Sequence, residues 1–180
     1  LSFAYTEPGL LPQLVKMVQA AKDRGFQVSV TTNGFTLPRI AERLAATGLD
    51  TLYVSVDGPA EIHNEIRGAK RSFERLCEGL QIVARQSQRP QTWAGVVLTP
   101  ETHVHLGKLL TELKPLRLRG VHAPLLSWVG EEAAAQHNLQ YGHWPATPPN
   151  SAEMAPSTMA PVALYASLQS ARAQANAQGL

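Results

Sequence analysis

Cysteine is the residue type that this sequence uses least, because Cys77 is the single cysteine in 180 residues. One cysteine excludes an internal disulfide framework and is typical of proteins in a reducing cytosol, so we predict a cytoplasmic protein. It also excludes a multi-cysteine metal site formed by this sequence itself. Cys77 falls on the apolar stripe of a predicted helix, which favours a small core residue over a reactive one.

Charged residues are also few, at 17% of the sequence, and 16 basic residues against 14 acidic ones leave a net charge of +2. This balance does not favour nucleic acid or an acidic membrane surface as a partner. No apolar run approaches the roughly 20 residues that cross a membrane, and no signal peptide pattern opens the sequence. The hydrophobic content of 44% fits a globular domain with a substantial core.

Residues 28–58 predict the unit around which the rest is arranged. A strand at 28–31 is followed by a helix from Pro38 to a stop at Gly48 and by a strand at 51–56. Since parallel strands need a crossover of this kind, the unit is a parallel βαβ. Similar strands at 1–5, 92–98 and 118–126, separated by helices, predict an α/β fold with a parallel sheet. The candidates are a partial (β/α) TIM-type barrel with parallel strands, truncated at both ends, and an open doubly wound sheet.

Composition divides the chain into three segments. Residues 1–138 form the predicted partial barrel, residues 139–161 a proline-rich irregular loop, and residues 162–180 a C-terminal helix leading to a missing strand. The sequence begins without methionine inside a predicted strand, so we expect a fragment of a larger domain. Within the barrel, residues 61–68 predict a polar loop and Ser72 predicts a helix N-cap.

Polar side chains collect where the predicted strands end. The carboxyl ends of parallel strands meet at one rim, where ligands of such folds bind. Hydroxyls and amides suit a ribose, and carboxylates suit an ammonium group. Each residue alone could serve a cap or a turn, but together they favour a binding site. The predicted site residues are Thr6, Glu7, Thr31, Asn33, Ser55 and Asp57, and no catalytic residue is assigned.

Other polar residues favour plainer interpretations. His103 and His105 are two apart and lack metal-ligand spacing, so no metal site is predicted. His122 on the fifth strand is interpreted as a core or rim histidine rather than one that meets substrate. The basic residues at 67, 70, 71 and 75 predict a solvated face rather than a site for an anionic substrate.

Five motifs, in order, resemble segments of the radical S-adenosylmethionine (radical SAM) enzymes. Residues 6–14 resemble the Gly-Gly-Glu-Pro segment of that family, and residues 31–34 match its Thr-Thr-Asn-Gly turn. Residues 48–58 are similar to its Gly-Leu-Asp and Ser-Leu-Asp-Gly pair. Residues 61–74, with the sequence EIHNEIRG followed by SFE, continue the resemblance, and Val97-Leu98-Thr99 fits the next strand.

The resemblance implies a partial barrel that binds S-adenosylmethionine and a 4Fe–4S cluster. In that family the reduced cluster cleaves S-adenosylmethionine to a 5′-deoxyadenosyl radical, which abstracts hydrogen from a substrate, and a flavodoxin or ferredoxin is the implied electron donor. Thr6 and Glu7 correspond to positions that meet the methionine amino group, and Ser55 to one that meets S-adenosylmethionine. Thr31, Asn33 and Asp57 would line the same rim. The cluster ligands, a Cys-x3-Cys-x2-Cys loop, are expected upstream of Leu1, so the isolated chain is predicted to be inactive.

Two departures from the family pattern keep alternatives open. The paired glycines before Glu-Pro are here Tyr5 and Thr6, which restrict close backbone approach, and the cysteine loop is absent from the sequence. One alternative is a non-catalytic nucleoside- or ligand-binding α/β module that has lost the cluster. A Schiff-base aldolase is disfavoured, because every lysine falls on a predicted helix or loop rather than at a strand end.

Overall fold

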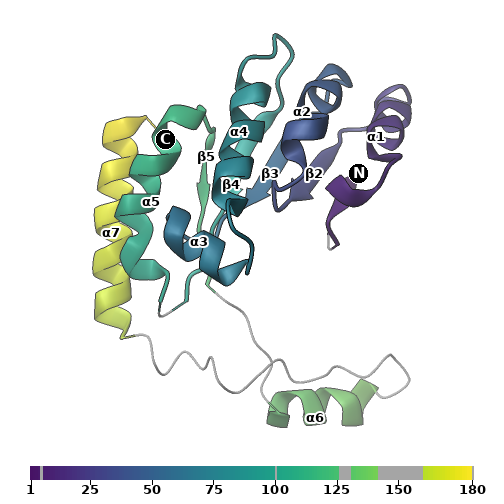
Figure 1. Ribbon diagram of the computed structural model, residues 1–180. Helices are drawn as coiled ribbons and strands as arrows, with labels where there is room; N and C mark the ends of the chain where they lie inside the picture. Colours follow the sequence, from purple (N-terminus) through teal and green to yellow (C-terminus); the bar gives the residue numbers. More distant parts are fainter. Residues whose placement is uncertain (5, 100, 126–130, 142–159, 180) are drawn as a thin grey trace.

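Five parallel strands form one sheet in the structure, which is a computed structural model describing residues 1–4, 6–99, 101–125, 131–141 and 160–179 (Figure 1). Each strand pairs with the one before it, so the spatial order is β1-β2-β3-β4-β5. A doubly wound sheet would reverse its order at a switch point. The prediction of a partial (β/α) barrel is therefore confirmed, and the doubly wound alternative is wrong. The strands are β1 (Ser2–Phe3), β2 (Ser29–Thr32), β3 (Thr51–Ser55), β4 (Gln91–Gly95) and β5 (Gly120–His122).

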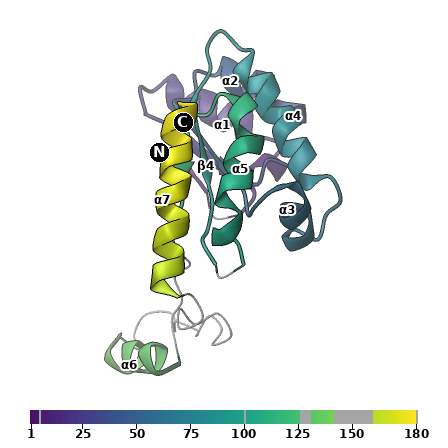
Figure 2. The same ribbon diagram turned by 90° about the vertical axis from the view of Figure 1, so that its left-hand side faces the viewer.

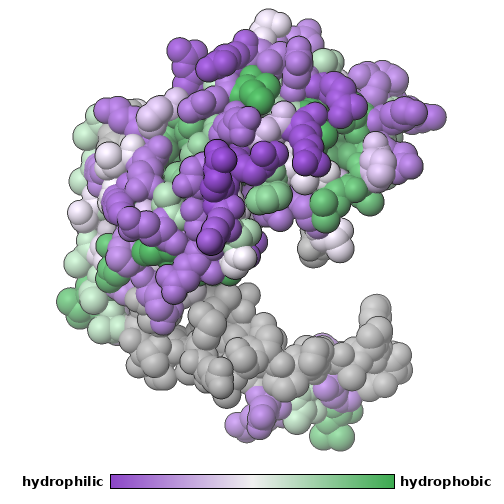
Figure 3. All heavy atoms as spheres, viewed as in Figure 1, coloured by the Kyte–Doolittle hydropathy of each residue, from purple (hydrophilic) through white to green (hydrophobic). Residues whose placement is uncertain are grey.

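Helices follow the strands and cover one face of the sheet (Figures 1 and 2). Their outward surface in Figure 3 is mostly hydrophilic, with hydrophobic residues in small separate groups. None of the described helices is long and apolar enough to cross a bilayer. The helices are α1 (Leu14–Lys22), α2 (Leu37–Ala46), α3 (Ala60–Ile66), α4 (Ser72–Ala84), α5 (Leu106–Leu113), α6 (Glu131–Tyr141) and α7 (Pro161–Gln178), with 3₁₀ turns at Pro8–Leu10, His103–His105 and Lys114–Leu116.

The strands bury alternate residues, because only one face of the sheet is covered. Leu52 and Val54 of β3 are 0% and 1% exposed and belong to the core beneath the helices. Tyr53, which lies between them, is 38% exposed on the opposite face and is in register with Thr31 of β2 and Trp93 of β4. This second, open face corresponds to the inside of a barrel.

Close packing of α2 against α4 fixes the helical layer. A Cβ at Gly79 of α4 would lie 2.6 Å from the Cβ of Leu37, so glycine is required for this approach. Cys77 on the same helix packs against the core and is half-buried, as predicted. Burial, together with the carboxylates of Glu112 and Glu74, raises the pKa of its thiol to about 11.

Two local predictions between β3 and α4 are wrong. Residues 61–68 are not a loop, because most of them form α3, whose inward side carries the buried His63. Ser72 is not an N-cap, since its hydroxyl contacts the His63 ring and Arg71 occupies the cap position with a φ of 65°. The α4 backbone is capped from outside by Asn64, whose Oδ1 accepts a 2.8 Å hydrogen bond from Phe73 N–H.

The C-terminal elements extend past the barrel strands. α6 runs across residue 138, where the sequence predicted a boundary between segments. Most of the predicted proline-rich loop lies outside the described residues. The division into three segments therefore stays a prediction. α7 packs along α5 (Figure 2). His103 Nδ1 lies 3.2 Å from Ser167 Oγ, and Gln174 Nε2 donates to the Gly107 carbonyl at 3.0 Å, so polar contacts fasten this helix to the barrel.

Candidate functional site

A pocket of about 190 Å³ lies at the carboxyl ends of β1, β2 and β3. Five of the six predicted site residues line it: Thr6, Glu7, Thr31, Asn33 and Ser55. Thr32 and Arg67 complete its lining, whereas Asp57 lies behind Arg67 and is not part of the wall. Strand ends far apart in sequence are thus brought to one rim, as the parallel arrangement predicts.

Glu7 is held by three neutral donors. Its Oε1 accepts hydrogen bonds from Gly9 N–H at 2.8 Å and from the Thr32 hydroxyl at 2.5 Å, and its Oε2 accepts one from Asn33 N–H at 2.7 Å. The Gly9 bond caps the 3₁₀ turn Pro8–Leu10, so Glu7 has a structural role as well. A carboxylate offers about four acceptor sites, two on each oxygen. Oε2 therefore retains capacity for a further donor, and among the residues that the structure describes no lysine or arginine pairs with Glu7.

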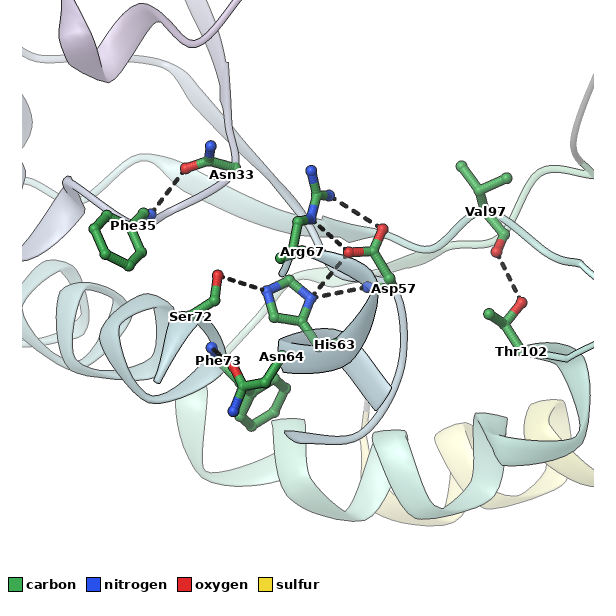
Figure 4. Close-up of polar contacts among 10 residues, drawn as sticks. All are labelled: Asn33, Phe35, Asp57, His63, Asn64, Arg67, Ser72, Phe73, Val97 and Thr102. Carbon is green, nitrogen blue, oxygen red and sulfur yellow. Dashed lines mark hydrogen bonds and ion pairs between the residues drawn. The ribbon is translucent and has the colours of Figure 1, made fainter. Parts of the chain in front are cut away.

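The turn after β2 orients Asn33 and Thr32. Asn33 Oδ1 accepts a 3.0 Å hydrogen bond from Phe35 N–H (Figure 4), and Thr32 Oγ1 accepts one from Gly34 N–H at 3.1 Å. Such side chain-to-backbone bonds are the ordinary chemistry of Asn-Gly turns. Gly34 has a φ of +79°, and a Cβ there would lie 2.8 Å from Leu76. The turn therefore lies close against α4. Because Oδ1 makes the turn bond, the Asn33 amide nitrogen does not take part in it.

Asp57 is the second carboxylate of this rim, and it forms an ion pair with Arg67. Arg67 Nε donates to Oδ2 at 2.6 Å and Nη2 donates to Oδ1 at 3.1 Å, a bidentate pair (Figure 4). Burial alone would raise the pKa of Asp57, but the His63 ring and the Arg67 guanidinium outweigh it and hold that pKa below its ordinary value. Two of the five guanidinium N–H donors are used in this way, and Arg67 brings the others to the pocket wall.

His63 connects this pair to α4. Its side chain is fully buried; Nδ1 lies 3.1 Å from both the backbone N and the Oδ2 of Asp57, and Nε2 lies 3.2 Å from Ser72 Oγ (Figure 4). Sequence reasoning assigned His63 no role, although it stands in the EIHNEIRG segment. The predicted solvated face holds for Arg67, Lys70 and Arg71, which are exposed. The sequence did not predict that Arg67 binds Asp57, or that Arg75, which is partly buried, donates to the Phe35 carbonyl and lies 5.4 Å from the centre of the Phe35 ring.

The remaining rim residues mainly support local structure. The Thr102 hydroxyl donates to the Val97 carbonyl at 3.0 Å and accepts from Thr99 N–H at 2.8 Å, so these threonines close the turn after β4. His122 is exposed at the end of β5, in register with Gly95. Within the described ranges, no three His, Cys, Asp or Glu side chains are grouped closely enough to hold a metal ion.

Part of this chain is similar in sequence to one protein family and to several known proteins. The family model described as the radical SAM superfamily matches residues 1–113. The AdoMet-dependent heme synthase of Methanosarcina barkeri is 37% identical over 81 residues, which cover 44% of this chain and 23% of that protein. A probable GTP 3′,8-cyclase of Saccharolobus islandicus is 39% identical over 77 residues, covering 42% of this chain and 25% of that protein. The chain matches no more than about a quarter of the length of these relatives.

Solved structures share the fold at low sequence identity. Streptococcus suis SuiB bound to S-adenosylmethionine superimposes with a TM-score of 0.58 at 15% identity, over 70% of this chain and 29% of that one. TYW1 with a lysine-pyruvate adduct bound gives a TM-score of 0.57 at 19% identity, over 70% of this chain and 41% of that one. The parallel sheet, the rim pocket and a family match over more than half of the sequence agree. This chain belongs to the radical SAM superfamily.

Proposed function

We propose that this chain supplies the S-adenosylmethionine site of a radical enzyme, and that the rim pocket holds the amino and carboxylate groups of the methionine half. One observation carries the proposal: a carboxylate with acceptor capacity left, Glu7, and a guanidinium with donors left, Arg67, line the same pocket. A zwitterionic amino acid presents the complementary pair of charges. Thr6, Thr31, Asn33 and Ser55 add uncharged polar groups around them.

The size of the pocket agrees with part of the ligand rather than all of it. Its volume of about 190 Å³ is below the roughly 300–1,000 Å³ of sites that enclose a whole small molecule. The amino acid moiety would fill the pocket, and the ribose would lie along the rim, where Thr31 stands next to the end of β2 and Ser55 ends β3. Asp57 then acts on the ligand through Arg67, rather than by the direct contact that the sequence predicted.

The described residues do not fit the iron–sulfur cluster that the family implies. Cys77 is half-buried on α4, and the raised pKa of its thiol opposes the thiolate form that binds metals. S-adenosylmethionine bound at the rim would supply the 5′-deoxyadenosyl group for radical chemistry, and residues of this chain would bind and orient it. The cluster ligands upstream of Leu1, a flavodoxin or ferredoxin as reductant, a cytoplasmic location and an inactive isolated chain stay predictions.

Binding calorimetry on the full chain tests the proposal. We expect S-adenosylmethionine to bind more tightly than decarboxylated S-adenosylmethionine, which lacks the group assigned to Arg67. Both should bind more tightly than methylthioadenosine, which lacks the amino and carboxylate groups. A charged hydrogen bond contributes about 1.5–3 kcal/mol, so each deletion should weaken binding roughly tenfold or more. Equal affinity for the three ligands, or no binding of S-adenosylmethionine, would overturn the assignment.

The second candidate is a non-catalytic nucleoside-binding module, which the hydroxyl groups of Thr6, Thr31 and Ser55 in the pocket wall would also serve. Anaerobic reconstitution of this chain with iron and sulfide should give no cluster absorbance under either candidate. Stoichiometric binding of iron and sulfide would contradict the module and the prediction that the cluster ligands lie upstream of Leu1. The gene sequence ahead of Leu1 separates the two candidates. A Cys-x3-Cys-x2-Cys motif there supports the enzyme, and an initiator methionine immediately before Leu1 supports the module.

A further inference from the structure

His63 is buried with a side-chain exposure of 0%, although both of its ring nitrogens are polar. Burying such a ring is unfavourable unless its nitrogens find partners. Nδ1 meets the backbone N–H and the carboxylate of Asp57, and Nε2 meets the hydroxyl of Ser72. The ring also packs edge-on against Phe73, with centroids 5.8 Å apart and an interplanar angle of 68°. The imidazole of His63, on α3, therefore connects this helix to Asp57 through Nδ1 and to α4 through Nε2.

The element that His63 fastens is short. α3 has seven residues, and an isolated helix of that length does not persist in water. It packs on α4, and the contacts His63–Ser72 and Asn64–Phe73 hold it there. Arg67 follows directly as the C-cap of α3, with its N–H donating to the His63 carbonyl at 3.0 Å. The position of the Arg67 backbone thus depends on the histidine one turn before it.

The His63 ring also contacts Asp57, the residue that binds the guanidinium of Arg67. Nδ1 accepts from Asp57 N–H when it carries no hydrogen and donates to Asp57 Oδ2 when it carries one. Nε2 and the Ser72 hydroxyl can each donate to the other, so this bond forms in either tautomer of the ring. The histidine therefore fixes both parts of the Asp57–Arg67 pair, which we call the clamp: the helix that Arg67 caps and the carboxylate that binds the guanidinium.

The order Ser72–His63–Asp57 resembles a hydrolytic triad, but burial excludes that reading. Ser72 is 3% exposed and His63 is buried, so no substrate carbonyl could reach the serine. We propose that His63 is a positioning residue for Arg67: it ties Asp57 and α3 to α4 so that the guanidinium is presented to the rim pocket in one geometry. The role assigned to Arg67 rests on the proposed function, whereas the structural coupling does not.

The test compares two buried histidines in the full chain. His63→Phe keeps a ring against Phe73 but removes both nitrogens, and Ser72→Ala removes one partner with little change of volume. His103→Phe is the matched control, since His103 is 6% exposed and has a serine partner in α7, Ser167. The measured quantity is exchange of the Arg67 Nε–H with water in ¹⁵N NMR, with the signal assigned by its loss in Arg67→Lys. Urea unfolding of each variant records the purely structural effect.

We expect His63→Phe to speed this exchange roughly tenfold or more, because the clamp opens more often. Ser72→Ala should speed it less, and His103→Phe should leave it unchanged even where it lowers the stability to the same degree. If His63→Phe does not fold, Ser72→Ala alone decides the matter. Arg67 exchange within twofold of wild type in the folded His63 or Ser72 variants would overturn the proposal.

A second readout separates this inference from the proposed function. We expect His63→Phe to weaken S-adenosylmethionine binding, and the double variant with Arg67→Ala to bind no more weakly than Arg67→Ala alone, because both changes remove the same contact. If the wild-type chain does not bind S-adenosylmethionine, the proposed function fails, and the exchange of Arg67 still tests the coupling. Additive losses of affinity would contradict the action of His63 through Arg67.

Discussion

Glu7 and Asp57 both follow strands at the same rim, but the donors around them differ in charge. Glu7 accepts from two backbone N–H groups and a hydroxyl, none of which carries charge. Asp57 accepts from the guanidinium of Arg67 in a bidentate pair. The first arrangement leaves a negative charge at the pocket wall, and the second leaves a neutral pair with unused N–H donors. Two similar carboxylates thereby give the pocket an acceptor end and a donor end.

The difference originates in local structure. Glu7 lies beside the 3₁₀ turn Pro8–Leu10 and the Asn-Gly turn after β2, where backbone N–H groups without helical or strand partners point at it. Asp57 precedes α3, and the C-cap residue of that helix, Arg67, returns to meet it. The backbone N–H groups around Glu7 thus leave its negative charge uncompensated, whereas the guanidinium of Arg67 compensates the charge of Asp57. Variants at these residues test whether the two ends act separately.

The largest effect is expected from Glu7→Gln. The amide has nearly the shape of the carboxylate but lacks its charge, and its NH₂ group opposes the donors already present. Loss of a charged hydrogen bond of about 1.5–3 kcal/mol should weaken S-adenosylmethionine binding roughly 10- to 100-fold in calorimetry. Glu42→Gln, an exposed change on α2, is the control. Affinity of Glu7→Gln within twofold of wild type would remove the acceptor end from the proposal.

A smaller effect is expected from Arg67→Ala, because the ligand carboxylate could still be solvated by water. S-adenosylmethionine should bind about tenfold more weakly, while the affinity for decarboxylated S-adenosylmethionine should change little. The same calorimetric titrations measure both ligands. Arg75→Ala, which removes the neighbouring arginine over Phe35, should leave both affinities near wild type. Equal losses for the two ligands would show that Arg67 supports the fold rather than the donor end.

Acid should weaken the Asp57 pair in a defined direction. The pKa of Asp57 in the folded chain lies below its ordinary value of 3.8, so the folded chain releases the proton more readily than the unfolded one. The pair therefore stabilises the fold above that ordinary value, and the stabilisation is lost as the pH falls through the lower, folded pKa. Urea unfolding between pH 7 and pH 2 should show this decline, and Asp57→Asn should make it shallower. A decline of equal steepness in the variant would contradict the pairing.

The smallest effect is expected at the surface, where Lys108 and Glu61 approach to 3.2 Å between α5 and α3. Both side chains are more than half exposed, so water and salt screen the pair. Lys108→Ala should change neither S-adenosylmethionine affinity nor the urea midpoint beyond error. Lys114→Ala, a change of an exposed lysine just after the same helix, is the matched control. A measurable loss of affinity in the Lys108 variant would mean that the pair with Glu61 helps to position α3, in addition to the contacts of α3 with α4.

The sequence predicted the alternation of strands and helices and the convergence of five polar residues, because both follow from periodicity and from the geometry of parallel strands. It did not predict α3. Helical propensity is weak over seven mostly polar residues, and the helix is held by His63 and Asn64 through contacts with α4. The ion pair of Arg67 was not predicted for the same reason, since its carboxylate partner ten residues earlier is reached only when α3 forms.

Cys77 makes the helical layer behind the pocket accessible to chemistry. With a thiol pKa of about 11, only roughly one sulfur in ten thousand is ionised at neutral pH, and the thiolate is the form that reacts with alkylating reagents. Because the sulfur is half-buried on the helix that carries Ser72, its alkylation should depend on transient opening of α4 from α2. A single sulfur atom, with no competing thiol in the sequence, can thus report whether a ligand bound at the rim slows the opening of the helices beneath it.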